Sequence, residues 1–149
     1  MQRRQRYIVI GFLVFVFLGI SALLARGLTG AGTERSKVLE VLEAQARGDA
    51  DAVLAALPAC RSHPACAQVT RDRVAELRRS GDVQILTYRP SIRIALTRQT
   101  GTGRVAWRAG TALPVVQCVR VRRDGPLTGG DVELLSVSAP IGRDESCPR

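Results

Sequence analysis

The stretch that decides the fold reads VLEAQARGDADAVL and covers residues 41–54. It begins inside a segment, Ser36–Ala46, whose apolar residues recur every three or four positions, which predicts an amphipathic helix. Gly48 is a typical helix stop, and Asp49 is placed to cap a second, short helix over Ala50–Leu57. Two helices joined at a Gly-Asp pair are therefore expected here.

A third helix is expected over Pro64–Ser80, after which the hydrophobic pattern changes to a period of two. The dipeptide repeat Thr100–Gly103 is expected to form a turn between strands. The predicted strands are Val83–Arg89, Ser91–Gln99, Arg104–Ala109, Leu113–Arg123 and Asp131–Ala139. Three helices followed by antiparallel strands indicate an α+β fold with the helices packed on one face of a sheet.

The helix–Gly–Asp–helix order of residues 41–54 resembles the opening of the NTF2-like (cystatin-like α+β) superfamily, and the likeness covers about Ser36–Ala139. The resemblance implies a cone of three helices packed on a curved antiparallel sheet of about five strands. Enzymes of that superfamily place Asp, His or Tyr inside the cone, and this sequence offers no such set. Bacterial single-pass proteins with an outer NTF2-like domain, including the Mce-associated membrane proteins, are similar in plan.

The segment Tyr7–Ala25 contains 19 residues without a charge. As a helix it would extend about 28 Å, close to the thickness of a bilayer core. Three arginines precede it and only Arg26 follows closely, which favours a cytoplasmic N-terminus. A transmembrane helix is therefore predicted, with a cleaved signal peptide as the alternative.

The expected organisation follows from this segment. A basic cytoplasmic stub occupies residues 1–6, the transmembrane helix residues 7–25, and a glycine-rich flexible linker residues 26–35. An extracytoplasmic domain at 36–140 and a tail at 141–149 complete the chain, which is expected to sit at the cell membrane.

All four cysteines lie beyond the apolar segment, at positions 60, 66, 118 and 147. An even number of cysteines outside the cytoplasm is typical of disulfides, and four allow three pairings. We favour Cys60–Cys66, which brackets a proline-containing turn between helices, and Cys118–Cys147, which would pin the tail to a strand. The cysteine spacing does not fit a zinc site, so neither a metal nor a cofactor is predicted.

The chain has 22 Lys and Arg against 13 Asp and Glu, a formal charge of +9, and Lys37 is its only lysine. The basic residues are scattered and aromatic residues make up only 4%, so a nucleic-acid partner is not expected. Five arginines occupy polar strand positions: Arg93, Arg104, Arg108, Arg120 and Arg122. Three interpretations stay open for them: a solvated face, a surface for anionic lipid or acidic polymer, and a docking face for an acidic partner.

Three further side chains are candidates for the lining of a cone. Gln117 lies among valines of its strand, where a buried amide needs partners, so it marks a pocket floor, an interface or an edge. Trp107 would either wall a pocket or pack in the core, and Tyr88 would either donate into a pocket or cap the core.

No set of catalytic residues emerges from the sequence, so no catalytic site is assigned. The sequence favours a non-catalytic binding or assembly module at the cell surface, with a protein partner. The alternative is a small-molecule or lipid-binding module that uses the cone cavity, with Gln117, Trp107 and Tyr88 as its lining. An enzyme is the less favoured third class.

Overall fold

A computed structural model describes residues 2–90, 98–124 and 131–148 of the chain. The helices are α1 (Gln2–Arg47), α2 (Ala50–Ala56), α3 (Pro58–Arg61) and α4 (Pro64–Glu76), and the strands are β1 (Val83–Arg89), β2 (Gln99–Ala109), β3 (Val115–Arg123) and β4 (Val132–Val137). The strands form one antiparallel sheet in the order β1-β2-β3-β4. The predicted α+β class is confirmed.

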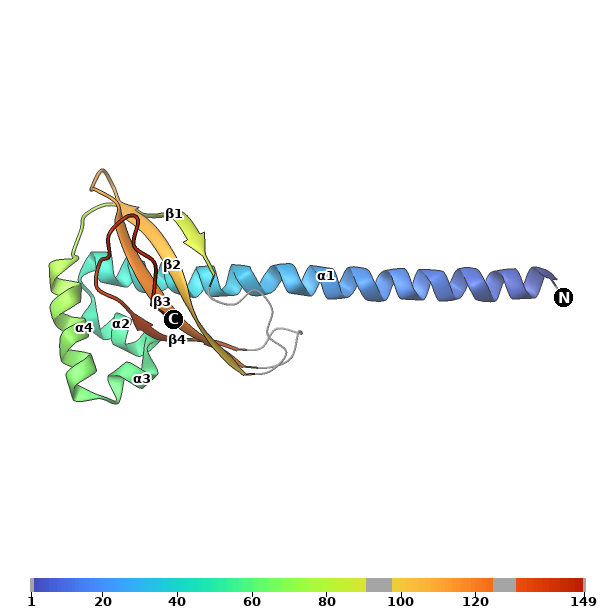
Figure 1. Cartoon of the computed structure of the whole chain (residues 1–149), viewed down its shortest axis with the longest axis horizontal. Coiled ribbons are helices and arrows are strands. Elements are labelled where there is room, and N and C mark those ends of the chain that lie inside the picture. The colour runs from blue at the N-terminus through green and yellow to red at the C-terminus, as the bar shows by residue number, and fades with distance from the viewer. Residues whose placement is uncertain (1, 91–97, 125–130, 149) are drawn as a thin grey trace.

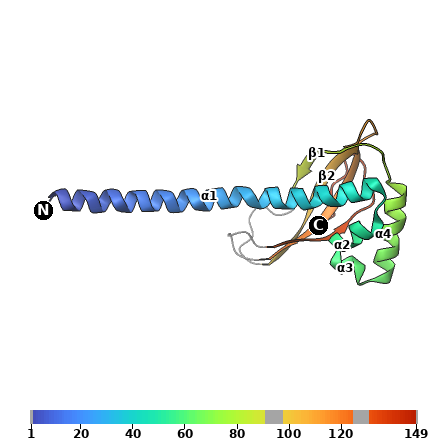
Figure 2. The same cartoon turned by 180° about the vertical axis from the view of Figure 1, so that it is seen from behind.

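The helices lie on one face of the sheet. In Figure 1 the sheet stands in front of the C-terminal part of α1, and Figure 2 shows α1 crossing the sheet from behind, with α2, α3 and α4 at the end away from the N-terminus. We call the face that contacts the helices the inner face and the opposite one the outer face. Alternation along β2 places Val105 and Trp107 inward in the core and Arg104 and Arg108 outward.

The predicted transmembrane helix is wrong. Across the residues that the structure describes, no helix is long and apolar enough to cross a membrane. The large apolar side chains described between Ile10 and Ile20 are exposed.

The structure also differs from the flexible linker expected at residues 26–35, because α1 runs through them as one helix to Arg47. Glycine lowers helix stability by about 1 kcal/mol relative to alanine, but it keeps its backbone N–H and does not block the helix as proline does. The glycines of this segment therefore weaken the helix without ending it.

The predicted cone with a sheet of about five strands is wrong, because the described residues form an open sheet of four strands. The expected strand Ser91–Gln99 falls largely on residues 91–97, outside the described part. The expected turn at Thr100–Gly103 is wrong, since these residues belong to β2 and pair with Val119–Arg122 of β3. The long ladder supplied by β3 holds two glycines in an extended conformation that their local preference does not favour.

Both predicted disulfides, Cys60–Cys66 and Cys118–Cys147, are confirmed. The first joins α3 to α4, and the second joins β3 to the segment after β4. The predicted cap is also present, because the Asp49 carboxylate accepts a hydrogen bond of 3.0 Å from the backbone N–H of Ala52. Local sequence chemistry thus sets the start of α2.

The edge strand β4 is tied to the helices by two cationic side chains. The Lys37 ammonium of α1 donates to the Val132 carbonyl at 2.6 Å, and the Arg73 guanidinium of α4 donates to the Val137 carbonyl at 2.7 Å. These bonds occupy edge carbonyls that would otherwise be free to pair with another chain.

Candidate functional site

The predicted candidates Gln117 and Trp107 meet in the core, where each has a relative exposure of 0%. The Gln117 side-chain oxygen accepts hydrogen bonds from the Trp107 indole N–H at 2.7 Å and from the Gln45 amide at 3.1 Å. The Gln117 amide nitrogen donates to the Ser138 carbonyl at 2.9 Å. This network joins α1, β2, β3 and the segment after β4, and internal partners occupy the Gln117 amide.

Tyr88 lies in a second cluster, with Glu34 of α1 and Arg123 of β3. The Tyr88 hydroxyl donates a short hydrogen bond to one oxygen of the Glu34 carboxylate, and the Arg123 guanidinium donates to the other oxygen at 3.0 Å. Glu34 has a relative exposure of 0%. A fully buried carboxylate needs such partners, because burial without them costs several kcal/mol.

The surroundings of Tyr88 favour its neutral form. Burial raises the pKa of the Tyr88 phenol well above its ordinary value, and the hydrogen bond to Glu34 and the Glu34 charge raise this pKa further, while the Arg123 charge lowers it. Tyr88 is therefore a hydrogen-bond donor to Glu34 at neutral pH and a poor proton donor for chemistry.

Sequence reasoning missed Glu34, because it lies in the stretch expected to be a flexible linker. It is the first acidic residue of the chain, and that position is the one signal that sets it apart. Sequence reasoning also missed Arg123. Its inward position follows from strand alternation, because it is the residue after the outward-facing Arg122.

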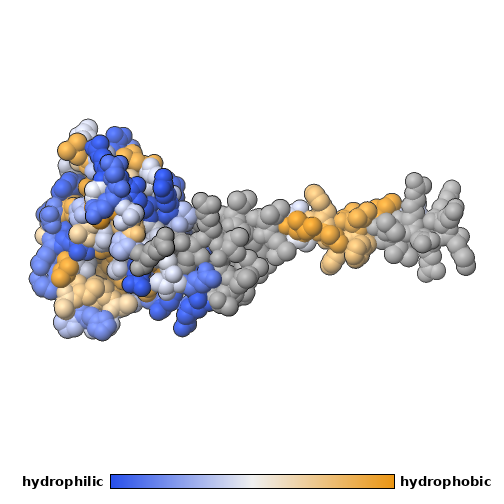
Figure 3. Space-filling model, in the orientation of Figure 1, coloured by the Kyte–Doolittle hydropathy of each residue, from blue (hydrophilic) through white to orange (hydrophobic). Residues whose placement is uncertain are grey.

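The predicted arginines have separate environments on the outer face. Arg108 donates to the Gln84 side chain, Arg122 pairs with Glu133 and lies 3.7 Å from Asp124, and Arg120 is exposed. The Arg104 guanidinium donates to the Arg143 carbonyl. Arg93 falls outside the described residues. Figure 3 shows hydrophilic side chains gathered over the sheet on this side.

The structure adds Arg89 to this surface. Arg89 of β1 lies directly opposite Arg104 of β2, and Arg120 of β3 lies one diagonal step from Arg104, since Arg104 pairs with Cys118. Side chains opposite each other approach to about 5 Å, and diagonal neighbours to about 7–8 Å. Among the described residues no carboxylate forms an ion pair with Arg89, Arg104 or Arg120. We call these three residues the arginine diagonal.

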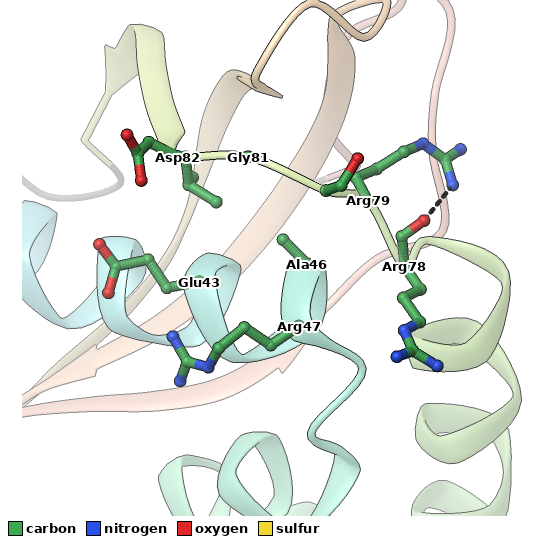
Figure 4. A pocket seen from close by; sticks show the side chains of 9 residues that line it. Glu43, Ala46, Arg47, Arg78, Arg79, Gly81 and Asp82 are labelled. Atoms are coloured by element: carbon green, nitrogen blue, oxygen red, sulfur yellow. Dashed lines mark hydrogen bonds between the residues drawn. The ribbon is translucent and has the colours of Figure 1, made fainter.

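A cleft of about 860 Å³ lies between the end of α1 and the connection from α4 to β1. Arg79 fixes one wall, because its backbone N–H donates to the Ala46 carbonyl at 2.9 Å and its guanidinium donates to the Arg78 carbonyl at 2.8 Å. Figure 4 shows Glu43 and Asp82 toward one end of the cleft and Arg78 and Arg79 toward the other. Charges of both signs line this cleft, so it does not select a ligand of one charge.

A second cleft of about 560 Å³ runs beside β4 and is lined by small side chains of α2 and by charged residues. Its lining residues are Lys37, Glu40, Ala52, Ala55, Ala56, Pro58, Asp131, Val132, Glu133 and Leu134. Neither cleft is lined by Gln117, Trp107 or Tyr88. In the described part of the chain, no three His, Cys, Asp or Glu residues are grouped to hold a metal ion.

The chain matches no known family model, no curated protein and no solved structure.

Proposed function

We propose that the chain is a non-catalytic binding or assembly module that works outside the cytoplasm and docks an acidic protein surface on the outer face of its sheet. The observation that carries this proposal is the arginine diagonal, in which three guanidinium groups on three neighbouring strands have no ion-pair partner among the described residues. The partner is taken to be a protein that presents several carboxylates.

The energetics of the diagonal support this choice. Like charges directly opposite each other on a sheet destabilise it, so Arg89 and Arg104 cost folding free energy unless anions or water screen them. A carboxylate matches the guanidinium fork with two parallel hydrogen bonds, and binding would remove the repulsion. The formal charge of +9 would also speed the encounter with an acidic partner.

The disulfides support a location outside the cytoplasm, since such bonds persist in oxidising compartments. The NTF2-like family is retained as a proposal, supported by the order of helix, Gly-Asp, helix and antiparallel strands. A binding role is favoured over catalysis because internal contacts occupy both buried polar clusters, around Gln117 and Glu34.

The test measures the affinity of the full chain for fluorescently labelled poly-L-glutamate by anisotropy, at low and at physiological ionic strength. We expect Arg120→Ala to weaken binding about threefold to fivefold, the scale of one solvent-exposed ion pair, and added salt to weaken it further. The matched control is Arg71→Ala, which removes an exposed arginine from α4 instead of the sheet. Equal losses for the two variants, or no binding by the unaltered chain, would contradict the proposal.

A further inference from the structure

Part of the outer face is covered by the chain that follows β4. Val116 and Cys118 face outward from β3, yet their relative exposures are only 6% and 4%. The backbone N–H groups of Ser138 and Ile141 donate to the carbonyls of Cys118 and Val116, both at 2.8 Å, which continues the ladder beyond β4. Residues 142–147, which we call the strap, then turn back over the sheet, as the red segment in front of β2 and β3 in Figure 1 shows.

Two attachments hold the strap to the sheet. The Cys118–Cys147 disulfide fixes its far end, and the Arg104 guanidinium donates to the Arg143 carbonyl near its start. Within the strap, the Gly142 N–H donates to the Glu145 carboxylate at 2.8 Å, which closes a tight turn. The strap thus lies against the middle residue of the arginine diagonal.

The contact between the strap and Arg104 is incomplete. The Nε atom of Arg104 is buried and has no hydrogen-bond partner in the described part of the chain. A buried donor without a partner is unfavourable, and more so when it belongs to a charged group. The Arg143 carbonyl of the strap therefore satisfies one donor of this guanidinium, while its Nε donor has no partner among the described residues.

We propose that the strap is a removable cover over Arg104 that weakens the docking of an acidic partner, and that the Cys118–Cys147 disulfide keeps it closed. This inference rests on the proposed function. The strap carries two exposed carboxylates, Asp144 and Glu145, against one cation, Arg143, directly after the carbonyl that accepts from Arg104, so its excess negative charge disfavours incoming acidic groups. Once the strap leaves, the whole Arg104 guanidinium is available to a carboxylate.

Opening is a thiol–disulfide exchange with a dithiol reductant. One thiolate of the dithiol attacks a sulfur of the Cys118–Cys147 bond and forms a mixed disulfide, and the second thiol then displaces the remaining protein sulfur. Two electrons and two protons pass to the protein, which gains two cysteine thiols, and the dithiol leaves as its own disulfide.

The experiment compares poly-L-glutamate affinity for the full chain and for the double variant Cys118→Ala, Cys147→Ala. We expect the double variant to bind about fivefold more tightly, the scale of one exposed ion pair, and expect Arg104→Ala in that background to remove the gain. The matched control, Cys60→Ala with Cys66→Ala, removes the disulfide between α3 and α4 and is expected to leave the affinity unchanged.

A second variant keeps the disulfide and guards against misfolding. Asp144→Asn with Glu145→Gln removes the competing charges, and the glutamine oxygen can still accept from Gly142, so tighter binding is again expected. If all chains bind equally and Arg120→Ala weakens each of them, the cover is refuted while the docking face stands. If none of them binds poly-L-glutamate, the proposed function fails and the cover falls with it.

Discussion

Replacing Gln117 with leucine tests whether the buried amide network stabilises the fold. Leucine has a similar volume, so the substitution creates little cavity, but it removes the acceptor of two buried donors, the Trp107 indole N–H and the Gln45 amide. Each donor left without a partner costs about 1–3 kcal/mol, so the free energy of unfolding should fall by about 2–6 kcal/mol. That is a large part of the 5–15 kcal/mol typical of a domain.

The assay is urea denaturation followed by tryptophan fluorescence, which reports on this site alone because Trp107 is the only tryptophan. The double variant Gln45→Leu, Gln117→Leu removes one of the two orphaned donors, so it should be more stable than the sum of the single losses predicts, by about 1–3 kcal/mol. The matched control is Gln84→Leu, an exposed glutamine of β1. A loss below about 1 kcal/mol for Gln117→Leu, or additive losses in the double variant, would refute the network.

Three further predictions concern other parts of the chain. The folded state raises the pKa of Tyr88 above its unfolded value of about 10, so the unfolded state loses its proton first and stability should fall as pH rises above about 10. Tyr88→Phe should remove this part of the pH dependence of the urea midpoint. Gly81→Ala should cost more than 1 kcal/mol in the same urea assay, because φ is +99° and an added Cβ would lie 2.8 Å from the Gly110 Cα, whereas Gly142→Ala should be nearly neutral. Loss of the Cys118–Cys147 disulfide should lower the thermal midpoint more than loss of Cys60–Cys66, because it closes the longer loop. Loop entropy predicts that the two disulfides stabilise the folded state by about 3.6 and about 2.4 kcal/mol, respectively. The reverse order of midpoints would contradict this chain-entropy account.

Local patterns predicted the elements whose cause is local. The Asp49 cap and the stop at Gly48 depend on neighbouring residues, and the structure shows both. The disulfide pairing followed from the turn at Pro64 and from a strand near the tail. The turn at Thr100–Gly103 failed because its glycines are held by a neighbouring strand, which local sequence does not reveal.

The candidate site was harder to predict, because its contacts join residues far apart in the chain. Gln117 needed partners, as its apolar neighbours indicated, but nothing in the sequence identified Gln45 or the Ser138 carbonyl as those partners. Glu34 was hidden for the same reason. Its partners lie on β1 and β3, and only the packing of α1 against the sheet brings Glu34 into contact with them.

The arginines of β3 differ in whether the described residues supply a carboxylate for their charge. Arg123 faces inward, and the fold provides a buried carboxylate, Glu34, for its charge. Arg122, one residue earlier, faces outward and pairs with Glu133, whereas Arg120, on the same face, has no ion-pair partner among the described residues. Neutralisation of the charge at the first two positions stabilises the fold itself. An arginine left without an ion-pair partner beside Arg104 adds repulsion, so an acidic surface from outside the chain is the physical reason we propose for it.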